Sequence, residues 1–429
     1  MSGPAREEPE VGLRGPAVSA VHVTARLNRS VLMHTYVDPQ VTFVAGEGSV
    51  LVDETGRRYL DFISGLAVTS LGHCHPDVAD AICRQAQTLV HVSNLYGNTL
   101  GLEVGVALDR LVRTGATGTT SATAEGRVFF CNSGAEANEC AFKLARRWAG
   151  PGRFEVVSAS GSFHGRTLAT LAATGQPSKQ APFAPLPAGF SQVPYDDLEA
   201  MGAALESGRV AAVVLEPIQG EGGVIVPSPG YLAGVRVLCD MHGALLIVDE
   251  IQTGLGRTGE WFGFHAGQVR ADIVTVAKAL GNGMPVGACW ARREVADAFR
   301  PGDHGSTFGG QPLAMAAARA TLEVMEREEV PSRSARAGER LRRALGDLAL
   351  VAGVRGAGLL LAVELDHPVA PAVVQRAMGR GLLVNAVRPE AVRLAPSLLV
   401  SDAEIDQAVG ILGEVLAAVD AAGSQEVPR

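Results

Sequence analysis

The 429-residue sequence lacks the features that define several common classes of protein. It has no apolar run long enough to cross a bilayer, and its first residues lack the apolar core of a signal peptide. Its six cysteines include no CxxC pair, and several lie in apolar runs typical of buried thiols. It has no basic stripe, and its formal net charge of −8 weighs against binding to nucleic acid or anionic membranes. We therefore expect a cytoplasmic protein with no nucleic-acid or membrane partner.

Two further absences narrow the choice of fold and ligand. No internal repeat or low-complexity tract is present, and no GxGxxG motif follows a first strand with an acidic residue about 20 positions later, which disfavours dinucleotide binding. We predict no metal site. With 47% hydrophobic and 19% charged residues, the chain has the composition of a globular protein that is long enough for one large domain and one smaller domain.

The order of strands and helices predicts an α/β fold. From Val128 onward, short apolar strands alternate with helical stretches, which indicates a largely parallel sheet covered on both faces. We assign residues 76–320 to this large domain, residues 29–75 and 321–429 to a smaller α+β domain, and residues 1–28 to a flexible tail. The elements expected in the smaller domain are a hairpin with its turn at Glu54 to Gly56, a helix around 334–345, strands at 358–363 and 382–385, and a final helix from Asp402.

Two residues at strand ends carry the strongest chemical signal. Asp249 closes the apolar run 245–248, and Lys278 follows the apolar run 273–277. A lysine at such a position is partly desolvated, so its pKa should fall and its amine should condense with an aldehyde, while a nearby acid holds a pyridine nitrogen protonated. The pair therefore suggests a pyridoxal phosphate site. The alternative is an ordinary lysine and aspartate that are exposed or joined in a salt bridge.

A second motif is typical of phosphate binding. A strand at 127–130 runs into Ser133, Gly134 and Ala135, after which the apolar spacing becomes helical. The N-terminus of a helix presents free backbone N–H groups and the positive end of the helix dipole, and a glycine there allows close approach. These residues are predicted to hold a cofactor phosphate, with the Ser133 hydroxyl as a further donor. A simple N-cap with a glycine turn is the alternative.

Two polar loops supply candidates for ring and substrate contacts. In the loop 161–167, the Phe163 ring is placed to stack on a pyridine ring and Arg166 to bind a carboxylate through two hydrogen bonds. A core phenylalanine and a surface arginine are the alternatives. In the loop 216–223, Glu221 is free either to be solvated or to pair with an arginine.

Together these motifs resemble a known family. Asn132 to Asn138, Phe163 to Thr167, Glu216 to Gly223, Asp249 to Gly254, Lys278 and Gly305 to Gly310 are similar in order and spacing to the motifs of class III aminotransferases, in the fold-type I pyridoxal phosphate group. The likeness runs from about residue 30 to about residue 415 and implies a mostly parallel sheet of seven-stranded type. Within the class, 72–76, 93–96, 381–385 and 392–396 most resemble the acetylornithine aminotransferases.

The resemblance implies roles for named residues. Lys278 and Asp249 are the expected catalytic residues, and a homodimer with shared active sites is expected because Thr307 would reach the phosphate of the neighbouring subunit. The expected cofactor contacts are Ser133, Gly134, Ala135, Phe163, Asp249, Glu250, Ile251, Gln252, Lys278 and Thr307. The expected substrate contacts are Arg166, Glu221, Ser306, Arg393 and Tyr36, with Glu221 as a gate that masks Arg393 in one half-reaction.

The resemblance also implies a reaction, with alternatives. The expected reaction moves the δ-amino group of N2-acetylornithine to 2-oxoglutarate, giving N-acetylglutamate 5-semialdehyde and glutamate in arginine biosynthesis. Leu66 stands where ornithine aminotransferases carry a tyrosine, which favours an acylated donor. Departures at Val68 to Ser70, Gly281 to Met284 and Gln311 leave open another ω-amine donor, such as ornithine, succinylornithine, 4-aminobutyrate or another diamine. An aminomutase or racemase, and a non-catalytic binding protein with this fold, are the other hypotheses.

Overall fold

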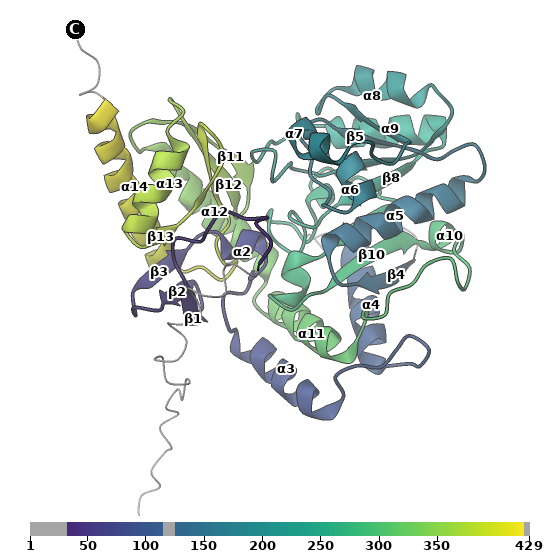
Figure 1. Cartoon of the computed structure of the whole chain (residues 1–429), viewed down its shortest axis with the longest axis horizontal. Coiled ribbons are helices and arrows are strands. Elements are labelled where there is room, and N and C mark those ends of the chain that lie inside the picture. Colours follow the sequence, from purple (N-terminus) through teal and green to yellow (C-terminus); the bar gives the residue numbers. More distant parts are fainter. Residues whose placement is uncertain (1–31, 115–124, 424–429) are drawn as a thin grey trace, which may run out of the picture.

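The protein is described by a computed structural model that covers residues 32–114 and 125–423. The tail predicted at residues 1–28 lies outside the described residues. The described strands form one sheet of seven strands and two sheets of four strands. Figure 1 shows the seven-stranded sheet and its helices on one side of the molecule, and α13 (Ala370–Gly379) and α14 (Asp402–Gly423) with the smaller sheets on the other.

The seven-stranded sheet has the order β4-β10-β9-β8-β7-β5-β6. Only β10 runs antiparallel to its neighbours, so six strands of this sheet point the same way. All residues of β7, β8 and β9 are buried, as expected for parallel strands covered on both faces. The strands are β4 (Gly126–Cys131), β5 (Glu155–Ala159), β6 (Phe190–Val193), β7 (Val210–Leu215), β8 (Leu245–Asp249), β9 (Ile273–Val276) and β10 (Gly287–Arg292). The predicted α/β fold with a mostly parallel sheet is confirmed.

Amphipathic helices cover this sheet. In α5 (Gly134–Ala149), the buried residues Ala137, Ala141, Leu144 and Ala145 recur at helical spacing, so one face of the helix packs on the sheet. The other helices between residues 64 and 327 are α2 (Ser64–Ala67), α3 (Pro76–Thr88), α4 (Thr99–Arg113), α6 (Leu168–Ala173), α7 (Pro177–Gln180), α8 (Leu198–Leu205), α9 (Tyr231–His242), α10 (Arg293–Ala296) and α11 (Pro312–Arg327).

One of the two smaller sheets joins the first part of the chain to the last, because β13 pairs with β3. One has the order β1-β2-β3-β13 and the other β11-β12-β15-β14, with α12 (Val330–Gly346) packed on β11 and β12. The predicted hairpin is confirmed, since β2 pairs antiparallel with β3 and Gly56 turns the chain at φ 85°. The strands are β1 (Phe43–Glu47), β2 (Val50–Asp53), β3 (Arg58–Asp61), β11 (Val351–Ala357), β12 (Leu360–Leu365), β13 (Leu382–Leu383), β14 (Asn385–Arg388) and β15 (Ala391–Leu394).

One predicted strand is two strands. The segment 382–385 was predicted as one element, but Leu382 and Leu383 pair with β3 in one sheet, whereas Asn385 begins β14 in the other. The chain passes from sheet to sheet at Val384, which is buried. Among the described helices, none has both the length and the apolar character needed to cross a membrane.

Candidate active site

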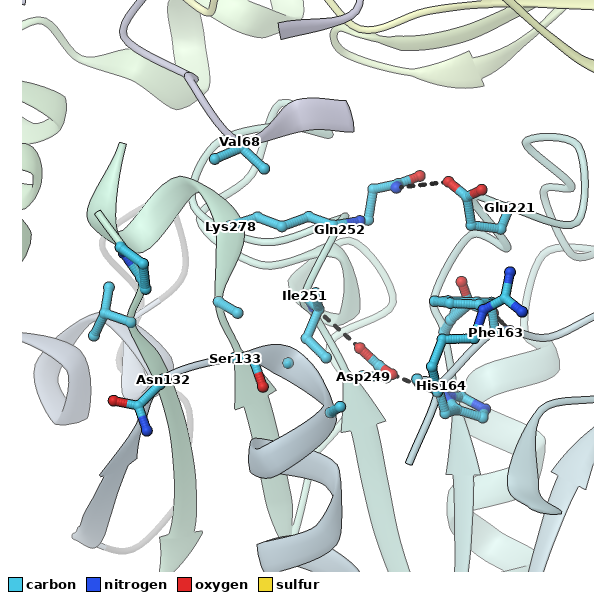
Figure 2. A pocket seen from close by; sticks show the side chains of 18 of the residues that line it. Val68, Asn132, Ser133, Phe163, His164, Glu221, Asp249, Ile251, Gln252 and Lys278 are labelled. Atoms are coloured by element: carbon cyan, nitrogen blue, oxygen red, sulfur yellow. Dashed lines mark hydrogen bonds and ion pairs between the residues drawn. The ribbon is translucent and has the colours of Figure 1, made fainter. Parts of the chain in front are cut away.

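A cavity of ≈ 400 Å³ opens at the carboxyl ends of the parallel strands of the large sheet (Figure 2). This is the edge where α/β sheets bind ligands, because the loops after successive strands converge there. Residues from the loops after β4, β5, β7, β8 and β9 line it, with Val68 from the segment after α2. Among the residues predicted from the sequence, the cavity lining contains Ser133, Gly134, Ala135, Phe163, Arg166, Glu221, Asp249, Ile251, Gln252 and Lys278.

Lys278 extends into this cavity from the end of β9. Its backbone adopts a φ of 41°, which is uncommon for a residue with a side chain and is typical of strained functional positions. Burial lowers the pKa of Lys278 from 10.5 to about 8, because the surrounding protein disfavours the charged ammonium. The carboxylates of Glu221 and Asp249 oppose that fall, and the guanidinium of Arg393 adds to it. The amine is therefore partly uncharged near neutral pH.

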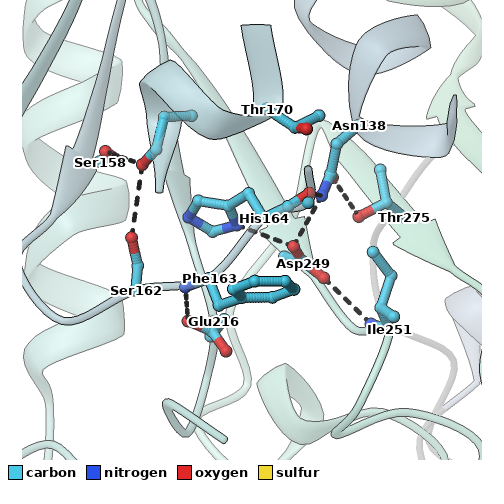
Figure 3. Close-up of polar contacts among 12 residues, drawn as sticks. Asn138, Ser158, Ser162, Phe163, His164, Thr170, Glu216, Asp249, Ile251 and Thr275 are labelled. Carbon is cyan, nitrogen blue, oxygen red and sulfur yellow. Dashed lines mark hydrogen bonds and ion pairs between the residues drawn. The ribbon is translucent and has the colours of Figure 1, made fainter. Parts of the chain in front are cut away.

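Asp249 lies at the end of β8 with 3% of its surface exposed. Its Oδ2 atom contacts His164 Nδ1 at 2.8 Å and accepts a hydrogen bond from Asn138 Nδ2 at 2.8 Å, while Oδ1 accepts one from the Ile251 backbone at 3.1 Å (Figure 3). Asn138 is itself held because its Oδ1 accepts from Thr275 Oγ1 at 2.9 Å. These contacts fix a carboxylate, in a single orientation, at one wall of the cavity.

His164 is a functional neighbour that sequence reasoning missed. Burial alone lowers the pKa of His164, but its hydrogen bond and charge interaction with Asp249 raise that pKa overall. Its Nε2 atom has no hydrogen-bond partner among the described residues. Its position beside Phe163 in a glycine-bearing loop was the one available signal, and the contact with Asp249 spans 85 positions of the chain. His164 thus holds the Asp249 carboxylate in place through a buried hydrogen bond.

Phe163 and Glu216 form another wall. The Phe163 backbone donates a hydrogen bond to Glu216 Oε2 at 3.0 Å, and the Arg166 guanidinium lies 5.6 Å from the centre of the Phe163 ring. Burial raises the pKa of Glu216 to about 7, and the nearby His164 charge opposes that rise. Both Phe163 and Arg166 line the cavity, as the sequence predicted, with the guanidinium over the aromatic face.

The N-terminus of α5 faces the same space. Ser133 is the N-cap, and its hydroxyl accepts a hydrogen bond from the Glu136 backbone at 3.2 Å. The first backbone N–H groups of a helix have no acceptor inside the helix, so the amides of Gly134 and Ala135 are available to a ligand. A Cβ atom at Gly134 would lie 2.7 Å from Ile251 Cδ1, so a larger residue here would displace the Ile251 side chain beside this cradle.

A buried ion pair closes one end of the cavity. Arg393 in β15 is 1% exposed, and its Nη1 contacts Glu221 Oε1 at 2.5 Å and Gln252 Oε1 at 3.1 Å. Its Nη2 has no partner among the described residues. Burial opposes ionisation of Glu221, but the charge of Arg393 lowers the pKa of Glu221 overall. Arg393 itself does not line the cavity, whereas its two partners Glu221 and Gln252 do.

Before the cavity wall at Val68, the backbone forms a left-handed turn. Ser64, Gly65, Leu66 and Ala67 have φ values of 49°, 61°, 67° and 64°, a run that costs roughly 1–2 kcal/mol for each residue with a Cβ atom. The Asp61 carboxylate supports the turn by accepting hydrogen bonds from the backbone of residues 63 and 64 at 2.8 and 2.9 Å. Leu66 is 42% exposed beside the cavity lining.

Five predicted site residues lie outside the cavity lining, and Arg393, described above, is one of them. Glu250 directs its carboxyl away, to the Thr253 hydroxyl and to the backbone of residues 263 and 264, where burial raises the pKa of Glu250 to about 7. Tyr36 is 89% exposed and Thr307 is also exposed. Ser306 contacts the lining residue Asn132 through its hydroxyl at 3.3 Å but does not line the cavity itself.

The cavity thus combines an amine of lowered pKa, a fixed carboxylate, an aromatic face and a helix N-terminus, which are the groups that fit pyridoxal phosphate. The family model for class III aminotransferases matches residues 32–416, and the chain belongs to this family. It is a pyridoxal phosphate-dependent aminotransferase with the fold-type I architecture. The predicted resemblance to this class is confirmed.

Particular relatives refine the comparison. The chain is 48% identical over 393 residues to the acetylornithine aminotransferase of Corynebacterium efficiens, covering 91% of this chain and 96% of the relative. It is 46% identical to that of Methanothermobacter thermautotrophicus, covering 91% and 97%. Among solved structures, the ornithine aminotransferase of Toxoplasma gondii, described with partial occupancy of PLP at its active site, has a TM-score of 0.87 at 34% identity, covering 95% and 99%. The N-acetylornithine aminotransferase of Stenotrophomonas maltophilia has a TM-score of 0.78 at 36% identity, covering 92% and 99%.

Proposed function

We propose that this enzyme transfers the δ-amino group of N2-acetylornithine to 2-oxoglutarate, giving N-acetylglutamate 5-semialdehyde and glutamate. One observation carries the proposal: the Lys278 amine and the Asp249 carboxylate line one cavity, and Glu221, which also lines it, pairs with Arg393. The donor is supported by relatives at 46% and 48% identity that are named acetylornithine aminotransferases. The reaction would belong to arginine biosynthesis and would take place in the cytoplasm.

The residues of the cavity would divide the work of holding the cofactor. When bound, pyridoxal phosphate supplies an electron sink for the amine-bearing carbon of the substrate. Lys278 would attach it covalently, Asp249 would hold a proton on the ring nitrogen, Phe163 would stack on the ring, and the amides of Gly134 and Ala135 would bind the phosphate. Ile251 and Gln252 would contact the other edge of the ring.

Lys278 would also move the proton in the reaction. An amine with a pKa of about 8 both accepts and returns a proton readily near neutral pH, so Lys278 Nζ is suited to carry it from the amine-bearing carbon of the substrate. His164 would act through Asp249, whose carboxylate it holds in position by a hydrogen bond. Neither role requires a group from outside this chain.

Two arginines would recognise carboxylates in the two half-reactions. Arg166 is open to the cavity and would bind a carboxylate in both. Arg393 is paired with Glu221 and would be released only for glutamate or 2-oxoglutarate, which carry a second carboxylate. With the acetylated amine, Glu221 would stay on Arg393, so that no buried guanidinium is left unpaired.

A homodimer would complete the site. Thr307 and Ser306 would reach the neighbouring subunit's cavity, and Tyr36 would contact substrate from a segment near the interface. The exposure of large apolar side chains near these residues supports a covered face, since Leu95 is 86%, Tyr96 72% and Phe308 62% exposed. We further propose residues 76–320 as the large domain, and residues 29–75 and 321–429 as the small one.

Ornithine itself is the second candidate donor. The ornithine aminotransferase of Toxoplasma gondii has the higher TM-score of the two solved structures described above. Leu66, where ornithine aminotransferases resemble one another in carrying a tyrosine, favours the acylated donor instead. An aminomutase or racemase would need no oxo-acid acceptor, so dependence on 2-oxoglutarate separates that class of reaction from an aminotransferase.

The test is a set of single turnovers followed by the visible absorbance of the bound cofactor. The holoenzyme is mixed separately with N2-acetylornithine, ornithine, 4-aminobutyrate and glutamate. The proposal expects the absorbance of the resting enzyme to be lost fastest with N2-acetylornithine and also with glutamate. If another amine reacts faster, the donor is wrong. In the Glu221→Ala variant, the half-reaction with the ω-amine should change more than that with glutamate, and equal losses would remove the gate.

A further inference from the structure

Glu221 stands at the tip of a closed loop. Gln219 and Ile225 form its base, with both backbone hydrogen bonds between them at 3.0 Å. Between them, Val224 is fully buried and has a φ of 56°, a conformation that a β-branched residue rarely adopts. Strain of this kind persists only where surrounding contacts over-determine the backbone. The loop 219–225 must therefore be held from outside.

Two arginines from the small antiparallel sheet hold it. Arg355 of β11 donates to Gly223 O from Nη2 at 2.7 Å and from Nε at 3.0 Å, and from Nε to Val224 O at 3.1 Å. Arg388 of β14 donates from Nε to Gly222 O at 2.9 Å. Three successive carbonyls of the loop thus accept hydrogen bonds from guanidinium groups. We call Arg355 and Arg388 the carbonyl clamp.

The clamp is built for this backbone. At Gly223, where φ is 117°, a Cβ atom would lie 2.6 Å from Arg388 Nε, so the guanidinium packs directly on the glycine. Arg355 is further anchored by an ion pair with Glu364 in the neighbouring strand β12. The clamp therefore ties the loop to the sheet that contains β15, and β15 carries Arg393. Both members of the Glu221–Arg393 pair are fixed to the same sheet.

We propose that Arg355 and Arg388 are positioning residues that hold Glu221 on Arg393 and so set how strongly the enzyme discriminates against dicarboxylates. The inference rests on the gate proposed above. With the loop clamped, Glu221 leaves Arg393 only by rotation of its side chain. Without the clamp, strain at Val224 drives the backbone to relax, and additional conformations appear in which Arg393 is free.

This arrangement predicts the sign of the effect. The apparent dissociation constant of a dicarboxylate equals its intrinsic value divided by the fraction of enzyme with Arg393 open. Loosening the clamp raises that fraction, so a dicarboxylate should bind more tightly to the variant than to the wild-type enzyme. Loss of one hydrogen bond of ordinary net strength corresponds to about a threefold to tenfold change. A ligand with a single carboxylate does not need Arg393 and should bind equally to both.

The experiment compares two unreactive ligands of equal length. Glutarate, which has two carboxylates, and pentanoate, which has one, are titrated by calorimetry into the holoenzyme of Arg388→Gln and Arg355→Gln. Arg342→Gln is the matched control, because Arg342 also donates to two carbonyls of the same sheet, Val354 O and Gly356 O, but does not touch the loop. Arg388 is exposed, so its substitution leaves the core intact even if Arg355→Gln folds poorly.

The expected result is that glutarate binds about threefold to tenfold more tightly to both clamp variants, while pentanoate is unchanged and Arg342→Gln resembles the wild type. Arg388→Lys should bring glutarate binding most of the way back to the wild-type value, since one donor suffices there. Arg355→Lys should bring it back less, since the Arg355 fork serves two carbonyls. If Glu221→Ala tightens glutarate binding but the clamp variants match Arg342→Gln, the clamp is overturned and the gate stands. If Glu221→Ala leaves glutarate binding unchanged, the gate and the clamp fall together.

Discussion

In the protein freed of cofactor, Lys278 should react with an acylating reagent far faster near neutral pH than an ordinary lysine. At pH 7.5, a pKa of about 8 leaves roughly one amine in four uncharged, whereas 10.5 would leave about one in a thousand. The reactive fraction is therefore about 200 times larger. Replacing Glu221 by Gln removes a charge that raises the pKa of Lys278, so the titration should move to lower pH. Arg393→Gln should move it to higher pH.

The composition of the chain makes this measurement direct. It has three lysines, Lys143, Lys179 and Lys278. Competitive labelling with trace acetic anhydride, followed by mass spectrometry of the three lysine peptides between pH 6 and pH 11, gives a titration curve for each in the same sample. Lys143 is exposed and reports any change in the reagent itself.

The result that refutes the reasoning is equally direct. A midpoint for Lys278 above pH 10 would show that the cavity solvates its ammonium and that burial does not lower its pKa. A midpoint near 8 that ignores Glu221→Gln and Arg393→Gln would keep the effect of burial and remove the charge interactions as a cause. If both burial and the charge interactions set the pKa of Lys278, the midpoint must shift in opposite directions in Glu221→Gln and Arg393→Gln.

Three further predictions concern stability and cofactor binding. The interaction with Asp249 outweighs burial and raises the folded pKa of His164 above 6.5. The free energy of unfolding that the wild type has in excess of His164→Asn should therefore be complete below pH 6.5 and fall as pH rises through the folded pKa. Urea unfolding of both proteins measures this difference. Gly134→Ala should weaken cofactor affinity about tenfold, whereas Gly105→Ala, whose Cβ atom meets its nearest neighbour at 3.9 Å, should not, and equal affinities would remove the cradle. Because burial lowers the folded pKa of Lys278 from 10.5 to about 8, the unfolded chain binds more protons in that range, and the cofactor-free protein should gain stability from pH 8 to pH 10.5 relative to Lys278→Met.

Residues at strand ends were the predictable part of the site. Asp249 and Lys278 each follow an uninterrupted apolar run, and parallel strands bring such ends to one edge of a sheet. The phosphate motif was also visible, because a strand, a glycine turn and helical spacing follow one another from residue 127. The Ser133 hydroxyl caps α5 by accepting a hydrogen bond, which leaves its O–H group as a donor for the predicted phosphate contact.

Contacts between distant loops were not predictable. His164 meets Asp249 across 85 positions, and Arg355 and Arg388 meet the Glu221 loop across more than 130. No periodicity in the sequence encodes such approaches, because they depend on how the sheets are placed relative to one another. The division of segment 382–385 between two sheets was missed for the same reason.

The left-handed turn at residues 64–67 restricts how the donor range of this enzyme can be altered by directed evolution. At Leu66 the backbone has a φ of 67°, where glycine, asparagine and aspartate are tolerated and β-branched residues are strongly disfavoured. In a mutant library at this position, the backbone conformation would therefore disfavour some residues whatever the substrate. Variants with short or polar side chains would accumulate there, and valine or isoleucine would be rare even if they fitted the substrate well.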